Sequence, residues 1–264
     1  MTRGVLLFAV DTETRSYTSL ARFCAQKIKQ HLQLPVALVT DKTITDSLFE
    51  HVITIEADSA QTRQINGVTE QWKNFQRYRA YELSPFDETI LLDTDYICGS
   101  DKLLTLFDYS KSFMCHRERL YLGARHSHDT VEHFGTNLDM YWATVVYFKK
   151  STEAAAVFTM MRMIQTHYDH YAKIYRFSPN SYRNDYAITI AINAVYGHCA
   201  DREVEIPWSL VNVEFNTDIK SIDANSYQLT FEKYHLDAMK KFKITTYNQD
   251  LHILNKDAVF RMIE

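Results

Sequence analysis

The sequence predicts an α/β fold, and three apolar runs carry that prediction. Residues 5–10 form a continuous apolar run, as expected of a strand covered on both faces. A segment with helical spacing follows over 16–32, and Pro35 then opens a second apolar run at 36–39. A third run, 90–92, ends directly at acidic residues. Strands that alternate with helices in this way build βαβ units.

The remaining elements follow from the same patterns. Ser16 or Thr18 can cap the first helix. Ser151 can cap a long helix, which must end before Pro179. Residues 115–135 fit no regular pattern, and the last third of the chain is less regular. In chain order we expect a strand over 51–55, a polar loop over 57–71, a helix over 71–83, a short helix over 101–107, a strand over 143–148, helices over 151–175 and 184–195, a strand over 243–246 and a terminal helix over 257–263.

Composition narrows the functional classes. The chain has 264 residues, enough for one large core, and no linker divides it, so we expect a single domain over 1–264. Its 6 glycines form neither a GxGxxG turn nor a Walker-type loop, which argues against a classical dinucleotide site or P-loop. A net charge of −4 does not by itself imply nucleic acid.

The cellular location follows from cysteines and hydropathy. Cys24 and Cys199 sit in apolar helical patterns and are expected to be buried thiols, which favours a reducing compartment. No apolar stretch has the length of a membrane span, and the first apolar run is too short for a signal peptide. We therefore expect a cytoplasmic protein without a membrane partner.

The third apolar run carries the most informative motif. Asp93 and Asp95 follow it directly, and in an extended segment residues i and i+2 project to the same side. Two carboxylates at the end of a buried strand face the crevice where α/β folds bind ligands, and they suit Mg²⁺ or Mn²⁺. Chance alone gives roughly four acid-x-acid triplets in a chain this acidic, so the preceding strand is the discriminating part.

With this motif the chain resembles nucleotide-sugar-dependent glycosyltransferases of the GT-A fold, particularly the glycogenin-like group and similar phage-encoded enzymes. A lone DxD would be weak, but a late His-x-x-x-Lys in the right order strengthens the match. The segments that carry it are 6–11 with Tyr17, the Leu-Asp-Thr-Asp of 92–95, the Arg-Asn-Asp-Tyr-Ala-Ile of 183–188, and the Asp-Leu-His-Ile-Leu-Asn-Lys of 250–256.

The resemblance implies an architecture. The GT-A fold is a Rossmann-like nucleotide-diphospho-sugar transferase fold with a single mixed, mostly parallel central sheet flanked by helices. Residues 1–100 would form the nucleotide-binding half, which ends in the DxD motif. Residues 101–264 would form the half that holds the donor sugar and the acceptor.

The resemblance also implies a metal site and a catalytic pair. Asp93, Asp95 and His252 would bind Mn²⁺ or Mg²⁺, and an imidazole beside two carboxylates favours Mn²⁺ over Ca²⁺. Asp185, with Asn184, would stabilise an oxocarbenium-like sugar or orient one of its hydroxyls. The same two residues also begin a predicted helix, where an Asp can stabilise the helix N-terminus without any role in catalysis.

The donor implied by the resemblance is a UDP-sugar. Asp11 and Tyr17 would hold the ribose or base, and Lys256 would pair with a phosphate. Of the two arginines before the DxD strand, Arg79 is expected at the diphosphate and Arg77 on the surface. The full set of donor-binding residues implied is Ala9, Asp11, Tyr17, Arg79, Thr94, Asn255 and Lys256.

The predicted function is sugar transfer, with retention of configuration by similarity, to an acceptor that carries a hydroxyl. Basic clusters at 116–119, 125–128 and 240–243, interleaved with aromatic residues, suggest a polyanionic acceptor. For a phage-encoded protein acting in the host cytoplasm, this would be a hydroxymethylated pyrimidine in DNA. The clusters can equally be solvated faces.

Two other functions fit the central motif. A haloacid-dehalogenase-like phosphatase would use Asp93 as its nucleophile, although such enzymes normally begin their domain with the motif. A sugar-nucleotide-binding module without catalysis is the other alternative, and donor hydrolysis distinguishes it from an enzyme.

Overall fold

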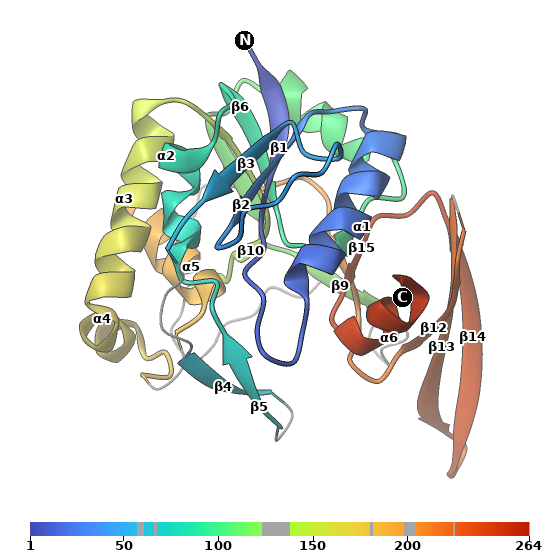
Figure 1. Cartoon of the computed structure of the whole chain (residues 1–264). Helices are drawn as coiled ribbons and strands as arrows, with labels where there is room; N and C mark the ends of the chain where they lie inside the picture. Colours follow the sequence, from blue (N-terminus) through green and yellow to red (C-terminus); the bar gives the residue numbers. More distant parts are fainter. Residues whose placement is uncertain are drawn as a thin grey trace.

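The centre of the fold is a six-stranded sheet with the order β3-β2-β1-β6-β10-β8 (Figure 1). The computed structural model describes residues 1–56, 61–65, 68–122, 138–179, 182–197, 204–223 and 225–263. In this sheet β10 runs antiparallel to its neighbours β6 and β8, while β3, β2, β1 and β6 are parallel. The predicted fold class, α/β with a mixed and mostly parallel central sheet, is confirmed. The strands are β1 (Arg3–Phe8), β2 (Val36–Thr40), β3 (His51–Thr54), β6 (Glu88–Leu92), β8 (Phe113–His116) and β10 (Trp142–Lys149).

Helices cover both faces of this sheet. Figure 1 shows α1 on one side and α3 and α5 on the other, and β2 and β6 are buried along their whole length as a result. Ser16 caps α1 by accepting from the Ser19 N–H, and Ser151 caps α3 by accepting from the Ala154 N–H. The α-helices are α1 (Tyr17–His31), α2 (Ala80–Leu83), α3 (Thr152–Thr166), α4 (Tyr168–Tyr175), α5 (Asn184–Val195) and α6 (Lys256–Ile263), and the 3₁₀ helices are η1 (Gln76–Arg79) and η2 (Lys102–Asp108).

A second, four-stranded sheet lies against the first and was not predicted from the sequence. Its order is β7-β15-β11-β9, in which β15, β11 and β9 are parallel and β7 is antiparallel to β15. Ile97, Val213 and Leu251 from this sheet pack with Leu20 of α1 and Val259 of α6 in a core of their own. The strands are β7 (Tyr96–Ile97), β9 (Arg119–Leu122), β11 (Leu210–Val213) and β15 (Leu251–Ile253).

Two further sheets form where the sequence pattern predicted a loop or little regular structure. The loop predicted over 57–71 is wrong, because β4 (Gln61–Ile65) and β5 (Val68–Trp72) pair there. The last third is more regular than expected, since β12 (Asp218–Ile222), β13 (Ser226–His235) and β14 (Ala238–Tyr247) form an antiparallel sheet at one side of the molecule (Figure 1). Strands rich in Gln, Thr and Lys lack the apolar run or clear alternation on which strand prediction depends.

Two predicted helices are also shorter than expected. The helix predicted from residue 71 begins at Gln76, because β5 extends to Trp72 and forces a different backbone there. The helix predicted over 151–175 is divided at His167, whose N–H still bonds to the Met163 carbonyl before α4 starts. The helix over 184–195 agrees with α5.

The buried thiols agree in part with expectation. Cys24, Cys98 and Cys115 are free and buried, whereas Cys199 lies outside the described residues. Within the described ranges, no helix is long and apolar enough to cross a membrane.

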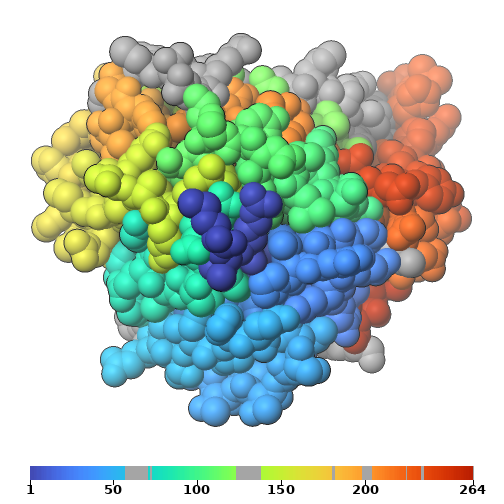
Figure 2. Space-filling model, turned by 90° about the horizontal axis from the view of Figure 1, so that it is seen from above, coloured from blue at the N-terminus to red at the C-terminus, as the bar shows by residue number. Residues whose placement is uncertain are grey.

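The strand directions determine which end of the sheet can hold a site. Figure 2 views the molecule from above, and the first residues of the chain, where β1 begins, lie at the centre of that face. β6 is parallel to β1, so Asp93 follows the far end of β6. The acidic motif therefore lies at the end opposite to the face in Figure 2, where open α/β sheets bind their ligands.

Candidate active site

A cavity of about 660 Å³ opens where β6 ends and β10 begins. Because β10 is antiparallel to β6, its first residues lie beside the last residues of β6, and the Asp93 N–H bonds to the Thr144 carbonyl at 2.9 Å. The same cavity is lined by residues from the start of α1, from β9, β11 and β15, and from the first turns of α5 and α6. Segments from both halves of the chain thus share one cavity.

The DxD motif forms a turn and not the extended segment expected from its spacing. The Tyr96 N–H bonds to the Asp93 carbonyl at 3.1 Å, and Thr94 and Asp95 occupy the turn between β6 and β7. The chain folds back here because β7 must pair with β15. Both carboxylates nevertheless line the cavity.

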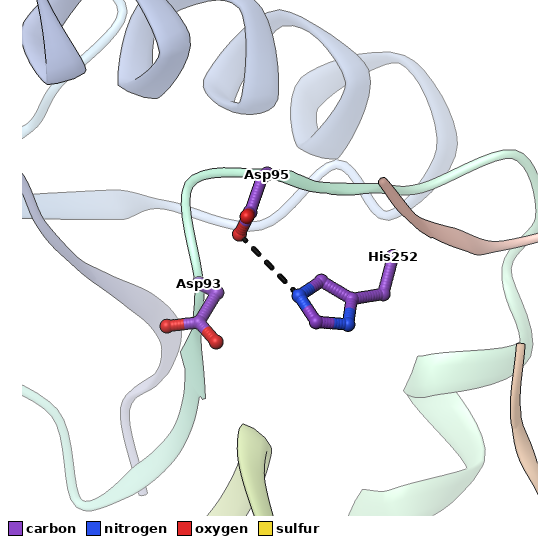
Figure 3. Close-up of side chains that lie close together, drawn as sticks. All are labelled: Asp93, Asp95 and His252. Carbon is purple, nitrogen blue, oxygen red and sulfur yellow. Dashed lines mark ion pairs between the residues drawn. The ribbon is translucent and has the colours of Figure 1, made fainter. Parts of the chain in front are cut away.

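His252 lies beside the two aspartates. One ligand atom from each of Asp93, Asp95 and His252 lies within 4.8 Å of the others. Figure 3 shows the imidazole reaching from another strand towards the turn that carries both carboxylates, and His252 Nε2 is 3.7 Å from Asp95 Oδ1. Residues separated by more than 150 positions in the chain therefore meet at one point.

The position of His252 is fixed by the attachment of β15 to the segment after the motif. Asp250 Oδ1 accepts the N–H groups of Gly99 and Ser100 at 2.8 and 2.9 Å, and its Oδ2 accepts the Tyr96 hydroxyl at 3.1 Å. A Cβ on Gly99 would lie 2.3 Å from the Gln249 carbonyl oxygen, so only glycine permits this approach. One buried carboxylate and one glycine thus hold β15 against the motif.

Each aspartate of the motif has a cationic partner. Arg77 is 1% exposed and pairs with Asp93, yet burial still holds the pKa of Asp93 above its usual value. Lys256 Nζ lies 2.6 Å from Asp95 Oδ2. Burial opposes ionisation of Asp95 too, but Lys256 and His252 outweigh it and lower the pKa of Asp95 to about 2.

This donor set fits a divalent cation. Two carboxylates and an imidazole suit Mn²⁺ or Mg²⁺ better than Ca²⁺, which takes oxygen ligands alone. Asp95 is ionised at neutral pH, as a ligand must be. An entering ion has to compete with the Lys256 ammonium for Asp95, so occupation of the site requires Lys256 to give up this partner.

Most of the residues expected at the site from the sequence line the cavity. These are Tyr17, Asp93, Thr94, Asp95, Asn184, Asp185, His252, Asn255 and Lys256. Asn255 also begins α6, where its Oδ1 accepts the Ala258 N–H and its Nδ2 donates to the Thr217 carbonyl. The Asn255 side chain therefore stabilises the start of α6, although the sequence predicted that it contacts the donor.

Ala9 and Asp11 do not line the cavity, in contrast to Phe8 and Val10. Ala9 is buried directly after β1, and its N–H bonds to the Val39 carbonyl at 2.9 Å. The Asp11 carboxylate accepts the Thr18 N–H and hydroxyl at 2.8 and 2.9 Å and pairs with Lys42 at 2.6 Å. In this structure Asp11 thus organises the loop before α1.

Neither of the two arginines lies where the sequence predicted it, and neither lines the cavity. Arg79 does not line the cavity and bonds instead to Gln76 at 2.8 Å and Glu82 at 3.1 Å. The expected surface residue, Arg77, is the buried one, and it also donates to the Ala143 carbonyl at 2.5 Å. A 3₁₀ helix places residues two apart on different sides, so only burial decides which arginine points inward.

Asp185 faces the cavity and does not act as a simple helix cap. Arg183 is the N-cap of α5, and no side chain caps this helix end. Asp185 Oδ1 instead accepts the Ala143 N–H at 3.0 Å, and its Oδ2 pairs with Arg183 at 2.8 Å. Asn184 is directed elsewhere, since its Nδ2 donates to the Asn74 carbonyl at 3.0 Å. Of the expected pair, Asp185 is therefore the better placed for chemistry.

The cavity also contains residues that the sequence analysis did not assign to the metal, the donor or catalysis. Arg119 lies over the ring of Trp142, with its guanidinium carbon 4.0 Å from the ring centroid, and over Tyr121 at 4.7 Å. Asn212 and Lys73 also line the cavity. Asn212 lies in a stretch read as irregular, and no spacing in the chain links it to the motif.

The basic clusters do not form one surface in the described part of the chain. Arg117 is tied to Asp139 at 2.7 Å and to Glu205 at 3.2 Å, and only its neighbour Arg119 lines the cavity. The cluster at 125–128 lies outside the described residues. The cluster at 240–243 is on β14.

No family model and no curated protein matches the chain. Among solved structures it is similar to the glycosyltransferase GlyE of Streptococcus pneumoniae, at 12% identity and a TM-score of 0.45, with 78% of this chain covering 46% of that one. It is also similar to the galactosyltransferase LgtC in complex with donor and acceptor sugar analogs, at 11% identity and a TM-score of 0.47, with 72% of this chain covering 70% of that one. A third similar structure is mouse xyloside xylosyltransferase 1, at 12% identity and a TM-score of 0.42, with 75% covering 83%.

These three proteins are glycosyltransferases, the class that the sequence resembles. The chain spans about half the length of GlyE.

The two arginines form a matched pair for a stability test. Replacing Arg77 by Met should destabilise the protein by about 3 kcal/mol, because it leaves Asp93 without its partner. The Arg79→Met variant should change the free energy of unfolding by no more than about 0.5 kcal/mol. Urea unfolding followed by circular dichroism measures both, and equal effects in the two variants would contradict the assignment.

Proposed function

We propose that this protein is a metal-dependent glycosyltransferase that moves a sugar from a nucleotide-diphosphate donor, UDP-sugar by resemblance, to a hydroxyl acceptor. The observation that carries the proposal is the meeting of Asp93, Asp95 and His252 in one cavity, with Lys256 beside them. Two carboxylates, an imidazole and a lysine together suit a metal-bound diphosphate. A cavity of about 660 Å³ has the size of a small-molecule site.

The chemical problem in this reaction is charge at the leaving group. The bond between the anomeric carbon and the diphosphate oxygen breaks, and negative charge grows on the diphosphate. A divalent ion held by Asp93, Asp95 and His252 would supply Lewis-acid stabilisation of that charge. Lys256 would add a compact positive charge, and the cavity also contains Arg15 and Lys73.

Another carboxylate in the cavity is available for the sugar side of the reaction. Asp185 projects a carboxylate into the cavity, where it can stabilise an oxocarbenium-like sugar, as carboxylates do in glycosidases. Its hydrogen bond from the Ala143 N–H and its ion pair with Arg183 hold it in place for that role. Tyr17, at the start of α1, offers an aromatic face to the base of the donor.

The finer features of the reaction are proposed on the resemblance alone. They are the division of the chain into a nucleotide half over 1–100 and an acceptor half over 101–264, retention of configuration, and Mn²⁺ as the preferred ion. Modified DNA as the acceptor stays a prediction, because Arg119 is the one described basic-cluster residue that lines the cavity. A gel shift at low salt tests for DNA affinity.

The alternative of a phosphatase with Asp93 as nucleophile is less compatible with the site. A nucleophilic carboxylate must be free to attack phosphorus, whereas Asp93 is held by the buried guanidinium of Arg77. Turnover of p-nitrophenyl phosphate with Mg²⁺ distinguishes the two functions.

Slow hydrolysis of the donor tests the proposed function without knowledge of the acceptor. With Mn²⁺ and a panel of UDP-sugars, we expect one donor to be hydrolysed by the wild-type protein. The Asp95→Asn variant should lose at least about 100-fold in rate, since it removes a charged ligand of the ion that stabilises the leaving group.

The exposed Asp108 provides the control for this test, because an Asp108→Asn variant makes the same chemical change away from the cavity. Its hydrolysis rate should equal that of the wild type. Donor binding without hydrolysis by any variant would favour the binding module, and equal loss in both variants would contradict the role of Asp95.

Lys256 should influence metal and nucleotide binding in opposite directions. A Lys256→Met variant removes the cation that competes for Asp95, so its affinity for Mn²⁺ alone should be equal to or higher than that of the wild type. Its affinity for UDP in the presence of Mn²⁺ should fall by about 10-fold, the loss of one charge-assisted contact. Isothermal titration calorimetry measures both affinities, and a parallel fall would show that Lys256 only supports the fold.

A further inference from the structure

Three side chains from neighbouring strands form a row that ends at the proposed metal site. The register of the four-stranded sheet pairs Tyr121 of β9 with Asn212 of β11, and Asn212 with His252 of β15. In parallel strands, residues paired in this way project to the same face of the sheet. All three line the cavity, so the row faces the site.

Asn212 is the central member of this row and is hydrogen-bonded on both sides. Its Oδ1 lies 2.8 Å from His252 Nδ1, and its side chain also bonds to Tyr121. Asn212 is 2% exposed, so water does not compete for either contact. An amide oxygen can only accept a hydrogen bond, so in this arrangement His252 Nδ1 must carry a proton.

The location of that proton decides whether His252 can bind an ion. In a neutral imidazole one nitrogen carries the proton and the other offers a lone pair. With the proton on Nδ1, the lone pair is on Nε2, the nitrogen 3.7 Å from Asp95 Oδ1. An amide turned by half a rotation would instead donate to Nδ1 and leave a proton on Nε2, where an ion would have to bind.

We propose that Asn212 is a positioning residue that holds His252 in its Nδ1–H tautomer and thereby presents Nε2 as a metal ligand. This inference rests on the proposed function, because it assigns Asn212 a task at the same metal site. Residues that orient a metal-binding histidine through its second nitrogen typically contribute 10- to 100-fold in metal affinity. Asn212 touches neither the ion nor the donor in this role.

The first measurement determines the tautomer directly in the metal-free protein. Long-range ¹H–¹⁵N correlation spectra of histidine-labelled protein distinguish a protonated ring nitrogen from one with a lone pair, and a His252→Gln variant assigns the signals. At a pH where His252 is neutral, we expect the proton on Nδ1. A proton on Nε2 would overturn the inference without any substitution at Asn212.

The second measurement compares variants by their affinity for Mn²⁺ alone. Asn212→Leu removes the acceptor and should weaken Mn²⁺ binding by about 10- to 100-fold. Asn212→Asp keeps an oxygen that accepts from Nδ1, so its affinity should stay within about 3-fold of the wild type or increase. If Asn212 only filled space, the Asp variant would not be expected to retain Mn²⁺ affinity while the Leu variant loses it.

A buried asparagine elsewhere serves as the control for loss of an amide. Asn193 is 4% exposed in α5, donates to the Thr189 carbonyl and does not line the cavity. The Asn193→Leu variant should bind Mn²⁺ like the wild type. Unchanged Mn²⁺ binding in a folded Asn212→Leu variant would overturn the inference, and if that variant does not fold, the tautomer measurement on the wild type decides.

Failure of the inference and failure of the proposed function give different results. If the wild-type protein binds no Mn²⁺, the metal-dependent function fails, and with it the ligand role of Nε2. If the wild type binds Mn²⁺ and the Asn212→Leu variant binds it equally well, only the role of Asn212 fails.

Discussion

The site depends on the close approach of β15 to the turn that follows β6. Asp250 makes this approach possible because its buried carboxylate accepts hydrogen bonds from Gly99, Ser100 and Tyr96. The strand pairing then continues into the motif itself, where the Ile253 N–H bonds to the Asp95 carbonyl at 2.9 Å. His252 lies between these two attachments, so its distance from the aspartates is set by the backbone.

Charge compensation is the second property of the site. Two carboxylates in one buried corner would repel each other, and each is stabilised by a cation, Asp93 by Arg77 and Asp95 by Lys256. The two pairs differ in character. Arg77 is buried, does not line the cavity and also donates to the Ala143 carbonyl, so it is a fixed partner of Asp93. Lys256 lies at the start of α6 and lines the cavity, where the proposed function would pair it with a phosphate of the donor.

How much the sequence could predict depended on whether a feature was local. The apolar runs of β1, β2 and β6 are buried on both faces, so their positions and the acidic motif after them were readable. Which of Arg77 and Arg79 is buried could not be predicted, because it depends on packing against segments that are distant in the sequence. Asn212 was also missed, since its partner His252 is 40 residues away and only strand register brings them together.

A single crystallographic experiment tests the meeting of the motif and the late histidine most directly. Crystals soaked with Mn²⁺ and UDP should show an anomalous difference peak in contact with Asp93, Asp95 and His252, with the diphosphate bound to the same ion. Absence of a peak at that point, or an ion bound elsewhere while His252 stays remote from both aspartates, would contradict a metal-dependent transferase built on these three side chains.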